Sequence, residues 1–163
     1  PRSGMLAEHL FKPLPPTISD DTAFHDRWAA YLPGWELPKL TPDMLTPHVG
    51  FILDYTSEIF HRELRRIGSY AALWERWFES PLGQWSARDL RSINHTFSGL
   101  TKLIFPSGVM EKEDARLLLR LAIELRLRIL LQLHTMNDQE FHVTELSFRD
   151  RETDEIETVR IEV

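Results

Sequence analysis

The sequence EKEDARLLLRLAIELRLRILLQL, residues 111–133, decides the fold class of this chain. Its apolar residues occupy nearly every side of a 3.6-residue period, which predicts one long helix. A single polar line follows this helix and consists of Glu113, Arg116, Arg120, Glu124 and Arg128. A helix that is apolar on almost every side is covered on almost every side, so we expect it at the centre of its domain.

Three further helices are predicted upstream of this one. The first follows Thr46-Pro47, a capping residue and a proline at the first helical position. A short helix with a largely aromatic face is expected over residues 69–78. The third opens at Ser86-Ala87-Arg88-Asp89, which has the spacing of a capping box. The four helices together predict a helical bundle over residues 46–136.

The N-terminal segment, residues 1–45, is rich in proline. Each proline lacks a backbone donor and restricts the residue before it, so long helices are disfavoured here. One short helix is expected over residues 23–31, with Asp21 or Thr22 as its cap. Residues 34–37 are expected to be extended.

Residues 137–163 change to strand-like alternation around a polar loop, which predicts a C-terminal β-hairpin. The predicted fold class is therefore mainly α: a helical bundle with a proline-rich N-terminal segment and a C-terminal hairpin. A hairpin alone is marginal in water, so it must dock on the bundle or join another sheet. At 163 residues, the chain is long enough for one domain with a small attachment.

The composition excludes several classes of protein. There are no cysteines, so disulfides and thiolate metal sites are impossible. No apolar run approaches the ~20 residues that a membrane span needs, so we expect no membrane partner. The formal charge of −6 arises entirely within residues 137–163, and this acidic region disfavours nonspecific nucleic-acid binding by these residues alone.

The chain start, PRSGMLAEHLF, lacks the apolar core of a signal peptide, and Met5 is a poor initiator. We expect a cytoplasmic chain that was cut from a longer protein.

The common catalytic and metal-binding motifs are absent from the sequence. No glycine begins the G-x-x-x-x-G-K-[ST] pattern of a phosphate-binding loop. No two histidines have the spacing of a zinc-binding helix, so no metal site is expected. Ser98 and Lys102 lie four residues apart on a predicted helix and resemble a nucleophile with its base, but no oxyanion donors accompany them. A solvated helix face explains this pair better.

Three arginines attract attention on pattern alone. Arg88 is the second residue of its predicted helix, where a cation opposes the helix dipole at a cost of roughly 0.3–1 kcal/mol. Such a residue either binds an anion at the helix N-terminus or pairs with Asp89 or another acid. Arg27 reads as an ordinary helix arginine. Arg126 lies off the polar line of its helix, so its charge needs a partner, and a structural ion pair is expected.

Two strings carry a specific family resemblance. They are Asp21-Thr22-Ala23-Phe24-His25-Asp26-Arg27 and Pro33-Gly34-Trp35-Glu36-Leu37-Pro38-Lys39. Together with weaker matches at Arg88-Asp89 and Ser98-Gly99-Leu100-Thr101-Lys102, they resemble the Lon-related AAA+ ATPase family of BREX phage-defence systems, the BrxL-like family. The resemblance covers nearly the whole chain and corresponds to the C-terminal part of the AAA+ region.

The resemblance implies a core similar to that of replicative MCM helicases, assembled in rings with ATP and Mg²⁺ at the subunit boundaries. Residues 1–45 then look like the end of the AAA+ core, residues 46–136 like the helical lid and residues 137–163 like an added hairpin. Arg27 looks like the arginine finger that reaches the neighbour's γ-phosphate, and Asp26 is expected to orient it or pair with it. Arg88 looks like the sensor-2 arginine of the lid, in contact with ATP.

The whole protein is expected to bind other copies of itself and DNA during phage defence. The phosphate-binding loop and the magnesium-binding strand are absent from these residues, so by themselves they are expected to hold no ATP and to hydrolyse none. Two other hypotheses stay open. One is a helical scaffold or oligomerisation module without a catalytic role. The other is part of an ATP-dependent protease, which requires a serine with a base within ~3 Å and oxyanion donors nearby.

Overall fold

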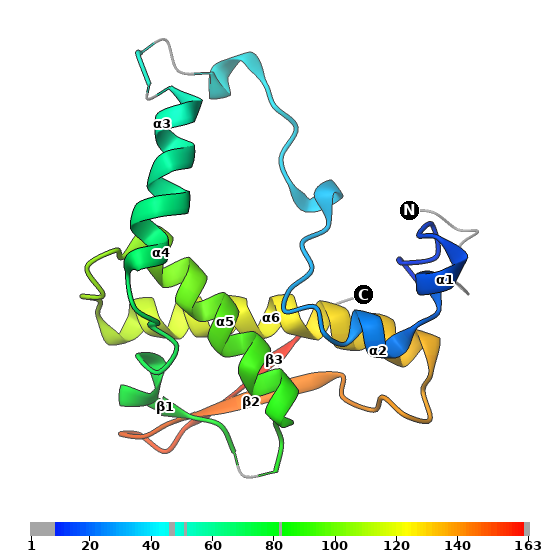
Figure 1. Ribbon diagram of the computed structural model, residues 1–163. Coiled ribbons are helices and arrows are strands. Elements are labelled where there is room, and N and C mark those ends of the chain that lie inside the picture. Colours follow the sequence, from blue (N-terminus) through cyan, green and yellow to red (C-terminus); the bar gives the residue numbers. More distant parts are fainter. Residues whose placement is uncertain (1–8, 46–47, 51, 82, 162–163) are drawn as a thin grey trace.

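The computed structural model describes residues 9–45, 48–50, 52–81 and 83–161. Figure 1 shows two long crossing helices above a small sheet, with an arm projecting from one end. The helical elements are α1 (Pro16–Ser19), α2 (Thr22–His25), η1 (Gly34–Glu36), η2 (Pro42–Met44), α3 (Leu53–Glu58), η3 (Ile59–Glu63), α4 (Leu64–Arg66), η4 (Trp74–Arg76), α5 (Ala87–Ile104) and α6 (Lys112–Met136). The strands are β1 (Phe78–Glu79), β2 (Glu145–Asp150) and β3 (Ile156–Arg160). The predicted mainly helical class is confirmed.

The two long helices begin where local capping signals place them. The side chain of Ser86 accepts a hydrogen bond from the N–H of Asp89, and the Asp89 carboxylate accepts one from the N–H of Ser86. This capping box satisfies backbone donors that a helix start leaves free. Helix α6 begins after Glu111, as expected, and extends three residues beyond Leu133.

The predicted central position of α6 is confirmed by its burial. It packs against α5 and against the sheet. The side chains of the shared core are almost completely buried, and they include Phe97, Leu119, Ile123, Leu146 and Phe148. Interdigitated packing of this kind makes α6 the rigid reference to which other segments attach.

The predicted C-terminal hairpin is confirmed, and it gains a third strand. β2 pairs with β3 in antiparallel register, with Leu146 opposite Val159. On its other edge β2 pairs with β1, where Phe78 lies opposite Asp150. The helix predicted over residues 69–78 is therefore wrong: this stretch forms a turn, η4 and β1. Hydrogen bonds from Arg151 to the carbonyls of residues 77 and 78 outweigh the local helical spacing.

A buried carboxylate ties the start of α6 to the hairpin. Asp150 is 1% exposed and accepts hydrogen bonds from Lys112 Nζ and Arg116 Nη2, each at 2.9 Å. The backbone N–H groups of Glu152 and Thr153 donate to the same carboxylate. Burial alone would raise the pKa of Asp150, but the hydrogen bonds from Lys112 and these backbone groups outweigh it and lower the pKa to about 2.

The first helix of the predicted bundle does not join it. Thr46 and Pro47 lie outside the described residues, and the helix begins only at Leu53, as α3. From there α3, η3 and α4 project away from the body as an arm (Figure 1). Apolar residues of this stretch remain in solvent: Val49 is fully exposed, and Leu53 is 84% exposed. Among the described residues, the long helices that pack together are therefore α5 and α6, and a four-helix bundle is not formed.

The N-terminal segment packs on α6 through aromatic residues. Phe11 is buried and stacks on His25, with Trp28 and Tyr31 at its edges. Asp21 caps α2, as one of the two predicted options, but the helix ends at His25 instead of Tyr31. The backbone leaves the helix because Tyr31 packs on Phe11 and donates its N–H to a carbonyl of α6. Residues 34–36 form a 3₁₀ turn instead of the extended piece predicted.

Candidate functional site

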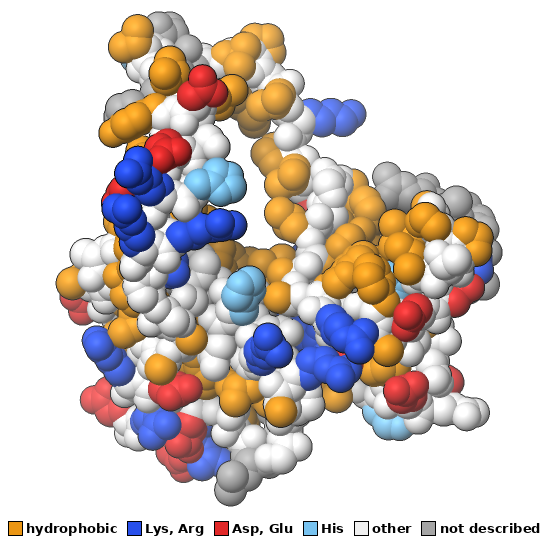
Figure 2. Space-filling model, viewed as in Figure 1, with side chains coloured by type: hydrophobic (Ala, Val, Ile, Leu, Met, Phe, Trp, Pro, Cys, Tyr) orange, Lys and Arg blue, Asp and Glu red, His pale blue; other side chains and the backbone are white. Residues whose placement is uncertain are grey.

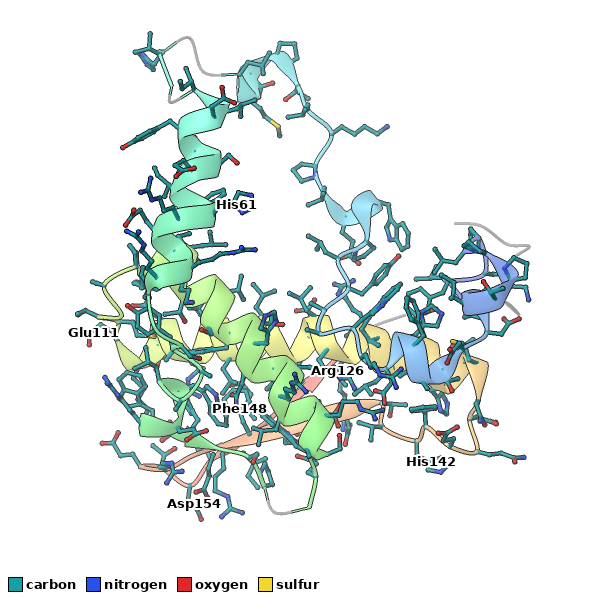
Figure 3. All side chains as sticks on the ribbon, in the orientation of Figure 1. His61, Glu111, Arg126, His142, Phe148 and Asp154 are labelled. Atoms are coloured by element: carbon teal, nitrogen blue, oxygen red, sulfur yellow. The ribbon has the colours of Figure 1, made fainter. Side chains whose placement is uncertain are left out.

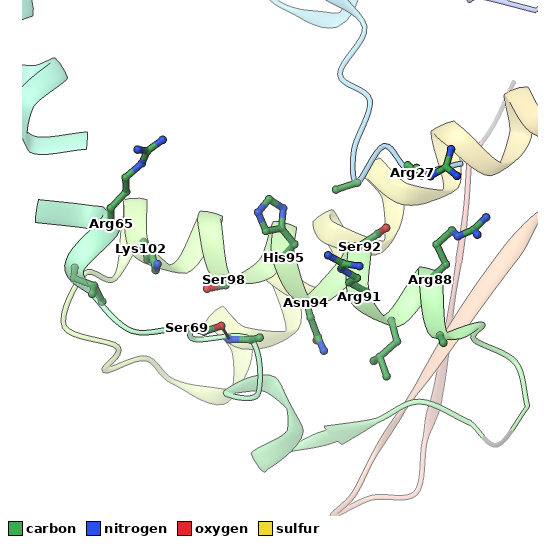
Figure 4. A pocket seen from close by; sticks show the side chains of 15 residues that line it. Arg27, Arg65, Ser69, Arg88, Arg91, Ser92, Asn94, His95, Ser98 and Lys102 are labelled. Carbon is green, nitrogen blue, oxygen red and sulfur yellow. Dashed lines mark hydrogen bonds between the residues drawn. The ribbon is translucent and has the colours of Figure 1, made fainter. Parts of the chain in front are cut away.

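A cationic groove follows one face of α5, between α4 and the segment after α2 (Figure 4). Its volume is about 1350 Å³. Its ionisable lining residues are Arg27, Arg65, Arg88, Arg91, His95 and Lys102, and no Asp or Glu of the described ranges lines it. In Figure 4, Arg27 and Arg88 lie at one end, Arg65 and Lys102 at the other, and His95 between them. Such a lining favours an anionic ligand.

Helical periodicity explains why one face of α5 carries these groups. Arg88, Arg91, His95 and Lys102 follow one another at intervals of three, four and seven residues. These intervals return to the same side of an α-helix. The opposite side packs into the core through buried residues such as Phe97. The buried stripe therefore turns the basic stripe outward, into the groove.

Most Lys and Arg side chains in the described part of the chain take part in ion pairs. Arg27, Arg65, Arg91 and Lys102 are in no ion pair with any described residue, and all four line this groove. Figure 2 shows basic side chains on this face, between the arm and α2. Because no carboxylate neutralises these four cations, the groove presents a positive potential although the whole chain carries −6.

Arg88 forms an ion pair and still exposes about half of its side chain. It is the second residue of α5, as predicted, and its side chain is 52% exposed. Its Nη1 donates to Oδ2 of Asp26. The predicted ion pair with an acid is therefore made, and the acid is Asp26, which is distant in the sequence. Arg88 lines the groove, where an anion would also meet the N-terminus of α5.

Arg27 is exposed, and a backbone carbonyl four residues earlier orients its side chain. Its Nη1 donates to the carbonyl oxygen of Ala23 at 2.7 Å. It follows the C-cap of α2, Asp26, and lies at the end of the groove that Arg88 also lines. The structure therefore brings together the two arginines that the family resemblance pairs in function, although 61 positions separate them in the sequence.

Asp26 has partners other than the one expected. Its side chain is 9% exposed, and its carboxylate bridges two arginines, with Oδ2 accepting from Arg88 and Oδ1 from Arg126 at 2.5 Å. The expected pairing of Asp26 with Arg27 is not made. The ion pair predicted for Arg126 is confirmed, and it is double, because Nε of Arg126 also donates to Asp89 Oδ1 at 2.8 Å.

Sequence reasoning missed Arg65, Arg91 and His95 as groove residues. The interval from Arg88 to Arg91 could have identified Arg91, whereas Arg65 comes from α4 and needs the tertiary structure. Ser98 and Lys102 both line the groove, but Ser98 Oγ accepts a hydrogen bond from the N–H of Tyr70 at 3.0 Å. No hydrogen bond joins Ser98 to Lys102 in the described structure, so this pair lacks the geometry of a nucleophile with its base.

The described ranges hold neither of two other kinds of site, a metal cluster or a membrane-spanning helix. No cluster of three or more His, Asp or Glu side chains within them could hold a metal ion. No helix within them is both long and apolar enough to cross a bilayer.

Comparisons with known proteins find the same family on sequence. A family model described as "Lon-like protease BrxL-like, ATPase domain" matches residues 2–147. The chain is 40% identical over 150 residues to the Lon-like protease BrxL of Bacillus cereus (strain H3081.97), an alignment that covers 91% of this chain and 22% of that protein. It is 40% identical over 146 residues to the Lon-like protease BrxL of Escherichia coli O9:H4 (strain HS), covering 89% of this chain and 20% of that protein. The chain thus spans about a fifth of the length of these curated relatives.

Proposed function

This chain belongs to the BrxL-like family of Lon-like proteases, within its ATPase domain, and on that premise we propose that the groove on α5 receives the phosphates of an ATP molecule held by another copy of the protein. The observation that carries the proposal is the shared groove. Arg27 and Arg88 line the same end of it, one without an ion pair in the described structure and one half exposed. Two guanidinium groups at one place match the charge of a triphosphate.

In this proposal Arg27 is the arginine finger. Phosphoryl transfer spreads negative charge over the oxygens of the γ-phosphate, and a finger stabilises that charge. A finger must be free to reach outward. Arg27 is exposed, and among the described residues its side chain donates only to the carbonyl oxygen of Ala23, so an approaching phosphate competes there with one neutral hydrogen bond.

Arg88 is the sensor-2 arginine in the same proposal. Asp26 holds one of its nitrogens and leaves about half of its side chain exposed, so Arg88 can bind a phosphate without losing its anchor. Because both arginines line one groove, both act on the same ATP. We therefore assign both of them to a nucleotide held by the neighbouring copy.

The lining of the groove also indicates which parts of an ATPase site other residues of the whole protein must supply. Its cations fit phosphate oxygens, and because no carboxylate lines it, it does not fit Mg²⁺. The loop that grips the phosphates and the ligands of Mg²⁺ therefore belong to other residues of the whole protein. In this proposal, copies assemble in a ring, hydrolyse ATP at their boundaries and use it for work on DNA during phage defence.

The test uses the full-length protein that contains these residues. Arg27→Ala is expected to lower kcat for ATP hydrolysis by on the order of 10³, because the transition state loses its counter-charge. Arg88→Ala is expected to lower kcat by at least about tenfold. The matched control is Arg76→Ala, since Arg76 is also exposed and without an ion pair in the described structure, but lies outside the groove. Unchanged kcat in both groove variants would disprove the proposal.

A second candidate function, assembly of copies through the arm, has an observation of its own. Apolar side chains gather on the arm and on the segment that leads to it (Figure 2). At least half of each of these side chains is exposed: Leu37, Leu40, Met44, Leu45, Ile52, Leu53 and Phe60. Contiguous apolar surface of this kind marks protein contacts. The arm borders the proposed nucleotide groove through Arg65, so assembly and ATP contact are compatible functions of one boundary.

A further inference from the structure

Arg126 lies at the junction of three segments, and its contacts are unusual for an arginine. It projects from the middle of α6, the most deeply buried helix, and is 1% exposed (Figure 3). Its neighbours Ile123 and Leu127 are completely buried. A side chain whose base is built into such a core has little freedom to move.

All three nitrogens of its guanidinium are engaged. Nε donates to Asp89 at the start of α5, and Nη2 donates to the carboxylate of Asp26. Nη1 donates to two backbone carbonyl oxygens, those of Asp26 and Trp28, each at 3.0 Å. These two carbonyls belong to the residues immediately before and after Arg27. Arg126 therefore holds the backbone on both sides of Arg27 without touching the groove itself.

Through Asp26, the same guanidinium is also linked to the second groove arginine, Arg88. Asp26 divides its carboxylate between Arg126 and Arg88, and Asp89 belongs to the capping box that starts the helix carrying Arg88. One buried side chain thus connects the segment of Arg27, the anchor of Arg88 and the N-terminus of α5. The planar fork of arginine suits this task, whereas the single ammonium of lysine cannot serve four acceptors in one plane.

We propose that Arg126 is the positioning residue of the groove: it sets the direction of Arg27 and, through Asp26, the position of Arg88. This inference rests on the proposed function of the groove. The competing explanation is an ion pair that stabilises the fold and has no separate effect on the reaction. The two explanations differ in how the effect of changing Arg126 depends on Arg27.

The test is a double-mutant cycle on ATP hydrolysis by the full-length protein. Arg126→Lys keeps the charge and loses the fork, so it is expected to lower kcat by tenfold or more while KM for ATP changes by less than about threefold. The control is Arg128→Lys, two residues along the same helix, where Arg128 pairs with Glu36 and Glu124 outside the groove. It is expected to keep kcat within about twofold.

The cycle adds Arg27→Ala, alone and combined with Arg126→Lys. If Arg126 acts through Arg27 and Arg88, the combined variant loses less activity than the product of the two single losses, because only the part that acts through Arg88 adds to the loss in Arg27→Ala. If the two losses multiply, or if Arg126→Lys retains full kcat, the inference is overturned. Should Arg126→Lys fail to assemble, Asp89→Asn replaces it in the cycle, because an amide oxygen can still cap α5 while the charge opposite Arg126 is gone.

The outcomes separate this inference from the proposed function beneath it. A loss in Arg27→Ala with none in Arg126→Lys refutes the positioning role and leaves the arginine finger intact. No loss in Arg27→Ala refutes the arginine finger and the positioning role together. Loss in both, without multiplication, supports both.

Discussion

Acidification should weaken the fold through Asp150, the buried carboxylate that joins α6 to the hairpin. Its pKa is lowered from 3.8 to about 2 in the folded protein. A group with a lowered folded-state pKa contributes its stability above the unfolded pKa, near 4, and loses it as the pH falls through the folded pKa. The shift corresponds to about 2 kcal/mol of unfolding free energy, lost between about pH 4 and pH 2.

The perturbation that isolates this contribution is Asp150→Asn. The amide removes the charge between Lys112 and Arg116, which lie 2.9 Å from the carboxylate, and it no longer titrates. At pH 7 the variant is expected to lose at least about 2 kcal/mol, since a half-buried ammonium and guanidinium lose their common partner. Between pH 4 and pH 2 its stability is expected to fall less steeply than that of the unmodified chain.

Urea unfolding followed by circular dichroism at pH 7, 4, 3 and 2 measures both quantities. Other carboxylates titrate in the same range, so the informative number is the difference between the two proteins at each pH. That difference should shrink by about 2 kcal/mol from pH 7 to pH 2. Parallel pH profiles for the two proteins would show that Asp150 does not titrate as the structure implies, and would refute the reasoning.

Two further predictions concern the capping box and the arm. Ser86→Ala removes the side-chain acceptor for the N–H of Asp89 and is expected to cost about 1 kcal/mol in urea unfolding with an unchanged m-value, whereas Ser86→Asn should restore most of it. Leu53→Ser combined with Phe60→Ser is expected to change the free energy of unfolding by no more than about 1 kcal/mol, because at least half of each side chain is exposed, and to reduce assembly of the full-length protein in sedimentation velocity. Unchanged assembly would count against the arm as a contact surface.

Features with local causes were predictable from sequence. The stripe of α6, the capping box of α5 and the strand alternation of the hairpin each depend on residues a few positions apart. The ion pair of Arg126 was predictable as well, because a charge on the apolar side of a buried helix needs a partner. Its partners were not, since Asp26 lies 100 positions away.

The errors have a common physical cause. Spacing at three and four residues predicted helices at residues 69–78 and from residue 46, but spacing does not say what an apolar face will contact. In the first stretch, Phe78 joined a sheet in which its partner, Asp150, comes 72 positions later. In the second, the apolar side of the arm found no partner among the described residues, so it remained in solvent.

The sequence by itself determined the helical class, the starts of the two long helices, the acidic hairpin and, through its specific strings, the family. Only the tertiary structure decided that Arg27 and Arg88 line one groove, that their neighbouring cations have no acidic partner among the described residues, and that Arg126 bonds to the backbone on both sides of Arg27. Local elements arise from interactions within a few residues, which a sequence displays directly. A groove requires segments distant in the chain to meet, and that meeting depends on how the buried faces of α5, α6 and the sheet pack together.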